Sequence, residues 1–223
     1  MSRILSRLAI AVLLSVEPAH ARQSFYNLGF ESAQNLPPDF STFSTSDALP
    51  GWLAYSGTNQ LDSIFYYNDA FLVPVQILSG DAVTLVGRFS VQMSSNGYTD
   101  YTNRYGPGSI TQNGLVPSDA RSVLFAASGA CLELSLGGQV LPYIAISNTA
   151  NYTIFGTEVS AFAGQTATLA FVCVSGIKTL DDIRFSPEYV PEPSTPTLLG
   201  LGGGYLLTVL RRTGRRRSLG KSC

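Results

Sequence analysis

The part of the chain between its two ends contains no stretch with the 3.6-residue periodicity of an amphipathic helix. Short runs of apolar, β-branched and aromatic residues recur instead, with turn residues between them. The runs that predict strands are 24–30, 51–55, 70–78, 82–86, 89–94, 122–127, 132–136, 139–146, 152–155, 166–174 and 180–185. Many short strands in one domain-sized segment favour an all-β fold, and we expect a jelly-roll β-sandwich.

The clearest turn in this segment is Gly137-Gly138. Before it, Leu132, Leu134 and Leu136 alternate with polar residues, and Gln139-Val140-Leu141 follows it. Two glycines between such runs are typical of a two-residue hairpin turn. We therefore expect a β-hairpin here, with the three leucines facing the core.

Residues 1–21 have the three parts of a secretory signal peptide. Arg3 and Arg7 precede an apolar stretch, 8–16, and Ala19-His20-Ala21 provides the small-residue cleavage pattern at Ala19 and Ala21. The apolar stretch is shorter than the roughly 20 residues that span a bilayer. We expect export, removal of this segment by a signal peptidase, and no contribution of it to the fold.

The C-terminal end combines three features in order. Val190-Pro191-Glu192-Pro193 leads into an apolar, glycine-rich segment and then into a tail with five arginines from 211 to 217. Prolines keep the first feature extended and accessible. Arginines are held on the cytoplasmic side of a membrane, so we expect residues 197–210 to form a transmembrane sorting helix.

This order of features resembles the PEP-CTERM sorting signal of Gram-negative bacteria that make exopolysaccharide. The resemblance covers about residues 190–217, although the tail continues to Cys223. It implies recognition of Pro191-Glu192-Pro193 by an exosortase-type processing enzyme, transient anchoring in the membrane, and final residence at the cell surface or in the extracellular matrix. The expected organisation is a signal peptide at 1–21, a β-sandwich domain at 22–187, a Pro-rich linker at 188–196, the sorting helix at 197–210 and a basic cytoplasmic tail at 211–223.

Three pieces of the expected β domain resemble the galactose-binding-like sandwiches of carbohydrate-binding modules. They are Asn27-Leu28-Gly29-Phe30-Glu31, Leu49-Pro50-Gly51-Trp52 and Leu180-Asp181-Asp182-Ile183. In such sandwiches, acids of the closing strand and near the first strand often hold a structural calcium ion. The resemblance therefore implies a candidate metal site at Glu31, Asp181 and Asp182.

Calcium needs six to eight oxygen ligands, and Asp39, Asp47 and nearby carbonyls are further candidates. Adjacent acids on a strand point to opposite faces, so only one of the two closing-strand aspartates can enter a shared site directly. The alternative is that Asp181 and Asp182 only cap the strand and solubilise its outer face.

Charge and histidine content exclude several classes of function. Between residues 22 and 195 there are six basic and fourteen acidic residues, a net charge of −8. Such a domain is a poor partner for nucleic acid or anionic lipid. The single histidine, His20, lies in the signal peptide. The mature protein therefore lacks Ser-His-Asp and Cys-His catalysis and any histidine-ligated zinc or iron site.

Two cysteines, Cys131 and Cys173, remain once Cys223 leaves with the tail. An exported domain with two cysteines favours a disulfide. Cys173 shares its strand parity with Leu169 and Phe171, whereas Cys131 is out of phase with the leucines that follow it. A Cys131–Cys173 bridge and two separate thiols stay open as alternatives.

Tyrosines provide the candidate ligand-binding residues. Tyr66 and Tyr67 precede Asn-Asp, and Tyr98, Tyr101 and Tyr105 lie in a polar segment, 96–108, that we expect to be a long surface loop. Exposed aromatic faces stack on sugar rings and carry a polar edge, so these five residues are candidates for glycan binding. The alternative is that they are ordinary loop tyrosines of an inert secreted protein. Trp52 is expected in the core.

A polysaccharide hydrolase would use two facing carboxylates. Glu31, Glu133 and Glu158 are available, although Glu133 alternates with inward leucines and is expected to face solvent. We expect a non-catalytic exported protein that serves as a structural or glycan-binding component of an exopolysaccharide or biofilm layer. The alternatives are a hydrolase with paired carboxylates and an inert surface spacer.

Overall fold

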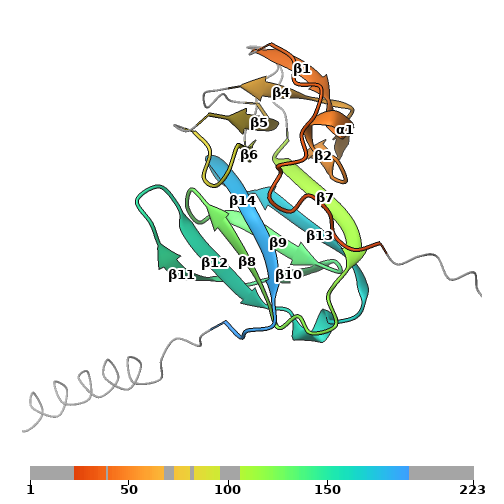
Figure 1. The fold of residues 1–223 in the computed structure, drawn as a ribbon, viewed down its shortest axis with the longest axis vertical. Helices are drawn as coiled ribbons and strands as arrows, with labels where there is room; N and C mark the ends of the chain where they lie inside the picture. The colour runs from red at the N-terminus through yellow and green to blue at the C-terminus, as the bar shows by residue number, and fades with distance from the viewer. Residues whose placement is uncertain (1–22, 39, 68–72, 81–82, 96–105, 191–223) are drawn as a thin grey trace, which may run out of the picture.

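The computed structural model describes residues 23–38, 40–67, 73–80, 83–95 and 106–190. In this part the chain forms two β-sheets, one short α-helix and one 3-10 turn. The two sheets form two layers (Figure 1). Both contribute side chains to one hydrophobic core. The predicted all-β sandwich is therefore confirmed.

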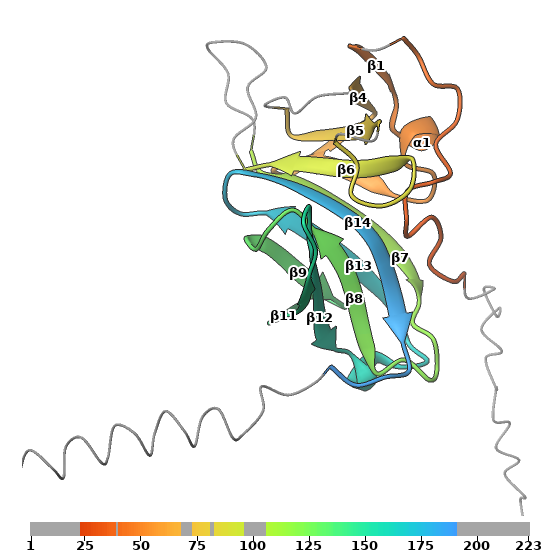
Figure 2. The same cartoon turned by 60° about the vertical axis from the view of Figure 1, so that its left-hand side comes forward.

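The larger sheet has eight strands. Its order is β1 (Ser41–Ser44), β4 (Ser63–Tyr67), β5 (Val75–Ser79), β6 (Phe89–Ser94), β14 (Ile177–Ser186), β8 (Ser122–Ala127), β12 (Thr153–Glu158) and β11 (Ile144–Asn148). All neighbours in it pair antiparallel except β4 and β5. The ten-residue strand β14 joins the two ends of the sheet, because its first half pairs with β6 and its second half with β8 (Figure 2).

The smaller sheet has six strands in the order β10 (Gln139–Leu141), β9 (Leu132–Leu136), β13 (Thr166–Cys173), β7 (Gly108–Leu115), β2 (Leu53–Ser56) and β3 (Asn59–Leu61). Every neighbouring pair in it is antiparallel. The helix α1 (Thr45–Ala48) follows β1, and the 3-10 turn η1 (Ser160–Phe162) precedes β13. The long strands β7 and β13 form the centre of this sheet.

The predicted hairpin is confirmed as β9 and β10. Leu136 pairs with Gln139, and Gly137 and Gly138 both have positive φ angles, 59° and 80°. Two consecutive residues with positive φ form the turn that matches the twist of a hairpin. Leu132, Leu134 and Leu136 are buried and Glu133 is exposed, as the alternation predicts.

Other predicted strands are wrong in detail. Residues 24–30 contain only a single bridge, from Ser24 to Leu115, and residues 83–86 form turns and bends. The run 139–146 is divided at Pro142 into β10 and the start of β11, which belong to different sheets. Proline lacks the amide that would continue a ladder, so the chain leaves one sheet there and enters the other.

Four strands were not predicted: β1, β3, β4 and β7. The most important of these is β7, Gly108–Leu115, which lies between β13 and β2. Its sequence contains two glycines and, besides Ser109, the polar residues Thr111, Gln112 and Asn113. Low strand propensity is overridden there, because both neighbouring strands supply backbone partners along its length.

No helix within the described ranges is long and apolar enough to cross a membrane. The expected signal peptide, the expected sorting helix at 197–210 and the basic tail lie outside those ranges. So do Pro191, Glu192 and Pro193, whereas Val190 is the last residue that the structure describes.

Candidate functional site

One face of the larger sheet combines aromatic and amide side chains in a single row across five strands. We call it the cross-sheet row, and it consists of Thr42, Phe65, Gln76, Gln92 and Thr179, each opposite the next in the register. Residues directly opposite each other share a face of a sheet. Their chain neighbours Ile64, Val75, Ile77 and Val91 are core residues. The row therefore lies on the face turned away from the core.

The amides in the middle of the row are held by one another. Gln76 Nε2 donates to Gln92 Oε1 at 2.6 Å, and Gln92 Nε2 donates to Thr179 Oγ1 at 3.5 Å. The Thr179 amide in turn donates to Ser128 Oγ at 2.9 Å. Gln76 and Gln92 are buried, at 0% and 5% exposure. Burial and mutual hydrogen bonds fix the orientation of these side chains.

The aromatic end of the row is open to solvent. Phe65 is 38% exposed, and Phe40, which directly precedes β1, is the most exposed of the large hydrophobic residues that the structure describes, at 66%. The Phe40 amide donates to Tyr66 O at 3.2 Å, which holds residue 40 against β4. Two exposed rings offer flat apolar surface of the kind on which a sugar ring stacks, whereas the amides of Gln76 and Gln92 are buried and do not reach a ligand.

The structure distributes the predicted glycan-binding tyrosines differently. Tyr66 lies on the core side of β4, where its ring packs edge-on against Phe43 at 5.9 Å and its hydroxyl lies 2.8 Å from Ser79 Oγ. Tyr67 ends β4, but its side chain is outside the described part of the structure. Tyr98, Tyr101 and Tyr105 lie outside the described ranges altogether.

Sequence reasoning did not single out Phe40 or Phe65. Residues 64–67 read Ile-Phe-Tyr-Tyr, so all four are apolar or aromatic, and nothing local says which pair faces outward. The register with β5, Phe65 opposite Gln76, decides this. Trp52, expected in the core, is 3% exposed, and its Nε1 donates to Asn27 O at 3.1 Å.

Two of the predicted metal-site acids, Glu31 and Asp181, lie near the start of β6. Glu31 Oε1 accepts hydrogen bonds from the amides of Arg88, at 2.8 Å, and Phe89, at 3.2 Å. Gly87 lies directly against this carboxylate, since a Cβ atom at residue 87 would come within 2.2 Å of Oε1. Glu31 thus anchors the segment that leads into β6.

Asp181 anchors the same segment from β14. Its Oδ2 accepts from the Val86 amide at 3.0 Å and from Ser90 Oγ at 2.6 Å, and its Oδ1 accepts from the Asp182 amide at 2.7 Å. A register shift between Asp181 and Arg184 and a positive φ of 43° at Asp182 turn the neighbouring carboxylate outward. There Asp182 Oδ2 pairs with Arg184 at 2.5 Å, so Asp182 does not join the site.

The donor set does not fit a calcium ion. Only Glu31 and Asp181 of the three predicted ligands come together, and three of their oxygens already accept N–H or O–H donors. Of the further candidates, Asp47 accepts from Asn35 at 3.2 Å, and Asp39 lies outside the described ranges. Within those ranges no three acidic, cysteine or histidine side chains form a group that could hold a metal. Calcium needs six to eight oxygens, so we assign no step or ligand role to it.

The Asp181 carboxyl is 1% exposed, and burial raises its pKa from 3.8 to about 6. Hydrogen bonds from Ser90, Val86 and the Asp182 amide oppose this rise, and the charge of Glu31 adds to it. Because the folded pKa is raised, the native state binds more protons than the unfolded chain between these two values. The contribution of this group to stability is full below pH 4 and is lost as the pH rises through 6.

We expect this titration to lower the free energy of unfolding by about 3 kcal/mol between pH 4 and pH 7, from a shift of about two pKa units. Urea unfolding at several pH values checks this for the wild type and for Asp181→Asn, with Asp182→Asn as the matched control. The decrease in the free energy of unfolding between pH 4 and pH 7 should become smaller in Asp181→Asn and stay the same in Asp182→Asn. An equal decrease in all three proteins would contradict the assignment.

The two cysteines are separate thiols, so the disulfide alternative is not what the structure shows. Cys173 is buried in β13, and burial raises the pKa of its thiol. Cys131 is exposed and precedes β9 with a φ of 82°, which takes it out of the strand alternation. The parity mismatch read from the sequence thus corresponds to one inward and one outward thiol.

Comparison with solved structures finds limited similarity at low sequence identity. No family model and no curated protein matches the chain. The carbohydrate-binding module TmCBM61, solved with beta-1,4-galactotriose, matches at 14% identity and a TM-score of 0.41, over 75% of this chain and 100% of that one. The enzymatically active domain of tailspike protein 4 from bacteriophage CBA120 matches at 16% identity and a TM-score of 0.34. That match covers 61% of this chain and 19% of the tailspike chain.

Proposed function

We propose that this protein is an exported, non-catalytic protein of the cell surface or extracellular matrix of a Gram-negative bacterium, and that its β-sandwich binds glycan in an exopolysaccharide layer. The export signal, the Pro-Glu-Pro motif and the basic tail support the location. The exposed rings of Phe40 and Phe65 at the β1 edge of the larger sheet support the binding.

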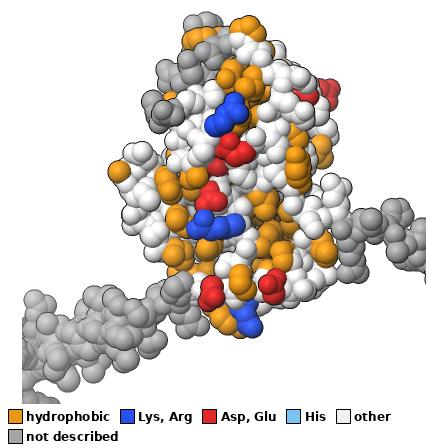
Figure 3. All heavy atoms as spheres, in the orientation of Figure 1, with side chains coloured by type: hydrophobic (Ala, Val, Ile, Leu, Met, Phe, Trp, Pro, Cys, Tyr) orange, Lys and Arg blue, Asp and Glu red, His pale blue; other side chains and the backbone are white. Residues whose placement is uncertain are grey.

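The chemistry of this surface suits a neutral or weakly charged polysaccharide. Apolar ring faces stack on the C–H faces of sugars, and a rigid aromatic side chain loses little conformational entropy on binding. Figure 3 shows side chains of both charge signs along the middle of the face that carries β14, with hydrophobic side chains on either side. A mixed surface of this kind differs from the basic patch that a nucleic acid requires.

A hydrolase is the alternative of a different class, and one observation bears on it. Glu31 and Asp181 approach each other, and Asp181 has the raised pKa of a proton donor. However, Asp181 is buried, and backbone amides hold both carboxylates. Catalytic carboxylates must reach a substrate, whereas these two bind the chain itself. We therefore favour binding over hydrolysis.

The test is binding of the exported, purified protein to the exopolysaccharide of its own host. We expect saturable binding that Phe40→Ala and Phe65→Ala each weaken about fivefold to tenfold, because each removes a stacking surface. Val140→Ala is the control, since Val140 is 57% exposed but lies in the other sheet. Unchanged affinity in both phenylalanine variants would contradict the proposed surface, and no binding at all would leave an inert spacer. Shortening of the polysaccharide would indicate a hydrolase.

A further inference from the structure

Residues 186–190 run from the last residue of β14 to the last residue that the structure describes. They stay in contact with the domain. We call this segment the strap. The Arg121 amide donates to Ser186 O at 2.8 Å, and Ser122 Oγ donates to Glu188 O at 2.7 Å. Ser122, the donor of this second bond, is buried at 1% exposure, whereas Glu188 is exposed. Two backbone carbonyls of the strap are therefore occupied by the start of β8.

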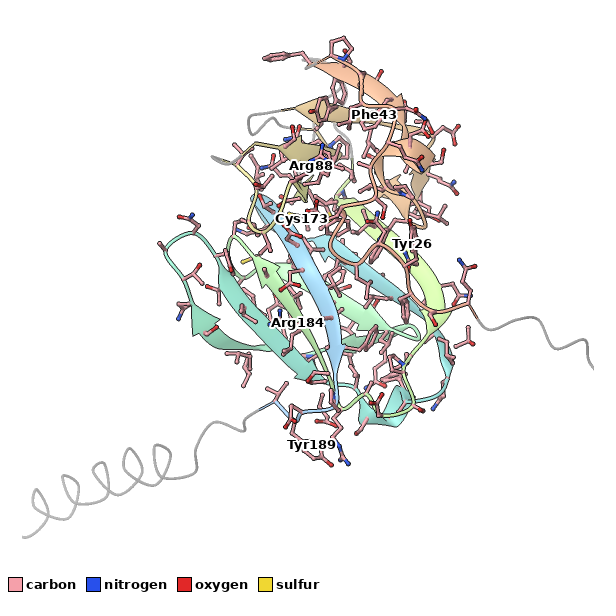
Figure 4. The ribbon with its side chains drawn as sticks, viewed as in Figure 1. Tyr26, Phe43, Arg88, Cys173, Arg184 and Tyr189 are labelled. Atoms are coloured by element: carbon pink, nitrogen blue, oxygen red, sulfur yellow. The ribbon has the colours of Figure 1, made fainter. Side chains whose placement is uncertain are left out.

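The side chain of Arg121 holds the strap a second time. Its guanidinium lies 4.4 Å from the centroid of the Tyr189 ring and donates from Nη1 to the Tyr189 hydroxyl. A cation over an aromatic face is a favourable pair even at an exposed site. Tyr189 itself is 60% exposed, so the contact lies at the surface of the lower end of the domain (Figure 4).

The last residue of the strap, Val190, packs over Gly156. A Cβ atom at Gly156 would lie 3.2 Å from Val190 Cγ2, 2.6 Å from Leu124 Cδ2 and 3.3 Å from Ile146 Cγ1. The missing side chain on β12 thus makes room for Val190 among apolar neighbours on the outer face of the larger sheet. Val190 is the residue directly before the Pro-Glu-Pro motif.

We propose that the folded domain withholds residues 186–190 from the processing enzyme, so that cleavage at the adjacent motif proceeds only when the strap detaches. Proteases bind several residues around the scissile bond as an extended strand through its backbone groups. Ser122 and Arg121 already occupy the carbonyls of residues 188 and 186. Cleavage then follows the fraction of molecules in which the strap is open. This inference rests on the proposed sorting function and adds a regulation of the same motif.

The first experiment measures the strap without the processing enzyme. A glutamate-specific endoprotease cleaves the Glu188–Tyr189 bond in the full-length precursor and in a free peptide of residues 184–196, with intact mass as the readout. We expect at least tenfold slower cleavage in the folded protein. Arg121→Ala with Ser122→Ala should raise the rate about tenfold, because the contacts of the Arg121 guanidinium and the Ser122 hydroxyl are lost while the backbone bond to Ser186 O remains. Equal rates in precursor and peptide overturn the proposal.

The matched control is Arg88→Ala. Arg88 also lies over an aromatic ring, that of Phe89 at 4.9 Å, but at the opposite end of the domain (Figure 4). This substitution should leave the rate of cleavage at the Glu188–Tyr189 bond unchanged. Thermal unfolding must show that the strap variant and the control are equally folded. An equal rise in both variants would mean general loosening of the domain and would overturn the proposal.

The second experiment follows conversion of the precursor to the mature protein in the host. We expect the Arg121→Ala, Ser122→Ala variant to be processed several-fold faster than the wild type and than Arg88→Ala. If the variant is cleaved faster by the endoprotease but is processed in the host at the wild-type rate, the proposal that the strap controls processing is overturned. If no variant, the wild type included, ever lost its tail, the sorting function itself would fail, and the strap would be a structural contact without a regulatory role.

Discussion

Replacing Phe125 with alanine is expected to lower the free energy of unfolding by about 4 kcal/mol, in the range measured for buried phenylalanines. The Phe125 ring is fully buried on β8, 5.2 Å from the rings of Tyr143 and Phe171 and 5.6 Å from that of Phe155. Phe171 belongs to the opposite sheet. Truncation removes the contact that joins the two sheets and leaves a cavity that neighbouring rings cannot fill.

Urea unfolding of the exported protein measures this effect as a shift of the midpoint at constant slope. Val174→Ala is the control, because Val174 is 54% exposed and should change stability by less than about 0.5 kcal/mol. A loss in Phe125→Ala no larger than in the control would mean that the two sheets do not share this core. A change in slope would indicate altered compactness of the denatured or native state, or a departure from two-state unfolding.

The Gly108→Ala substitution should also be strongly disruptive, with a loss of about 3 kcal/mol or more. Gly108 opens β7 opposite Ser56, and a Cβ atom there would lie 1.7 Å from Pro74 O and 2.5 Å from Pro74 C. Pro74 O also accepts the amide of Ser94 at 3.1 Å. The clash is with backbone atoms, so the larger sheet has to move away from the smaller one.

Gly29→Ala is the matched control for this substitution. Nothing lies within 4 Å of a Cβ atom at residue 29, and its φ is not positive, so alanine should be neutral or slightly stabilising. Thermal unfolding of both variants checks the contrast. Equal melting temperatures would show that the two sheets do not approach each other at Gly108 as the structure has it.

The proposed glycan-binding surface and the strap lie at opposite ends of the molecule. Phe40 and Phe65 lie at the β1 edge of the larger sheet, whereas Arg121 and Tyr189 lie near the start of β8 and the end of β14. A protein released or attached through its C-terminal end would therefore present the aromatic end away from the point of attachment. This arrangement suits a component that is fixed by one end and binds a polysaccharide with the other.

Local patterns predicted some elements well because their causes are local. The Gly137-Gly138 turn needs only two residues with positive φ, and the leucines before it need only a period of two. The runs 89–94, 122–127 and 132–136 coincide with β6, β8 and β9 for the same reason. A strand with strong β-propensity and clean alternation can be predicted with little knowledge of the strands that pair with it.

Candidate sites were predicted less well because they depend on residues far apart in the chain. Asp181 and Glu31 do meet, as the resemblance implied, but the backbone amides of residues 86, 88 and 89 turn the pair into an anchor for a loop. The strand β7 forms because β2 and β13 flank it and Gln112 bonds the backbone of Tyr26 at 2.6 and 2.8 Å. None of these partners is near β7 in the sequence.

The sequence by itself determined the all-β class, the lack of any histidine after His20 and the motifs that predict sorting, because composition and short motifs carry them. Only the tertiary structure decided that Phe65 rather than Tyr66 faces outward, that Asp182 turns away from Asp181, and that residues 186–190 are held by Arg121 and Ser122. Each of these depends on the register between strands distant in the chain. A shift of one residue in that register exchanges the two faces of a strand, and no local pattern sets it.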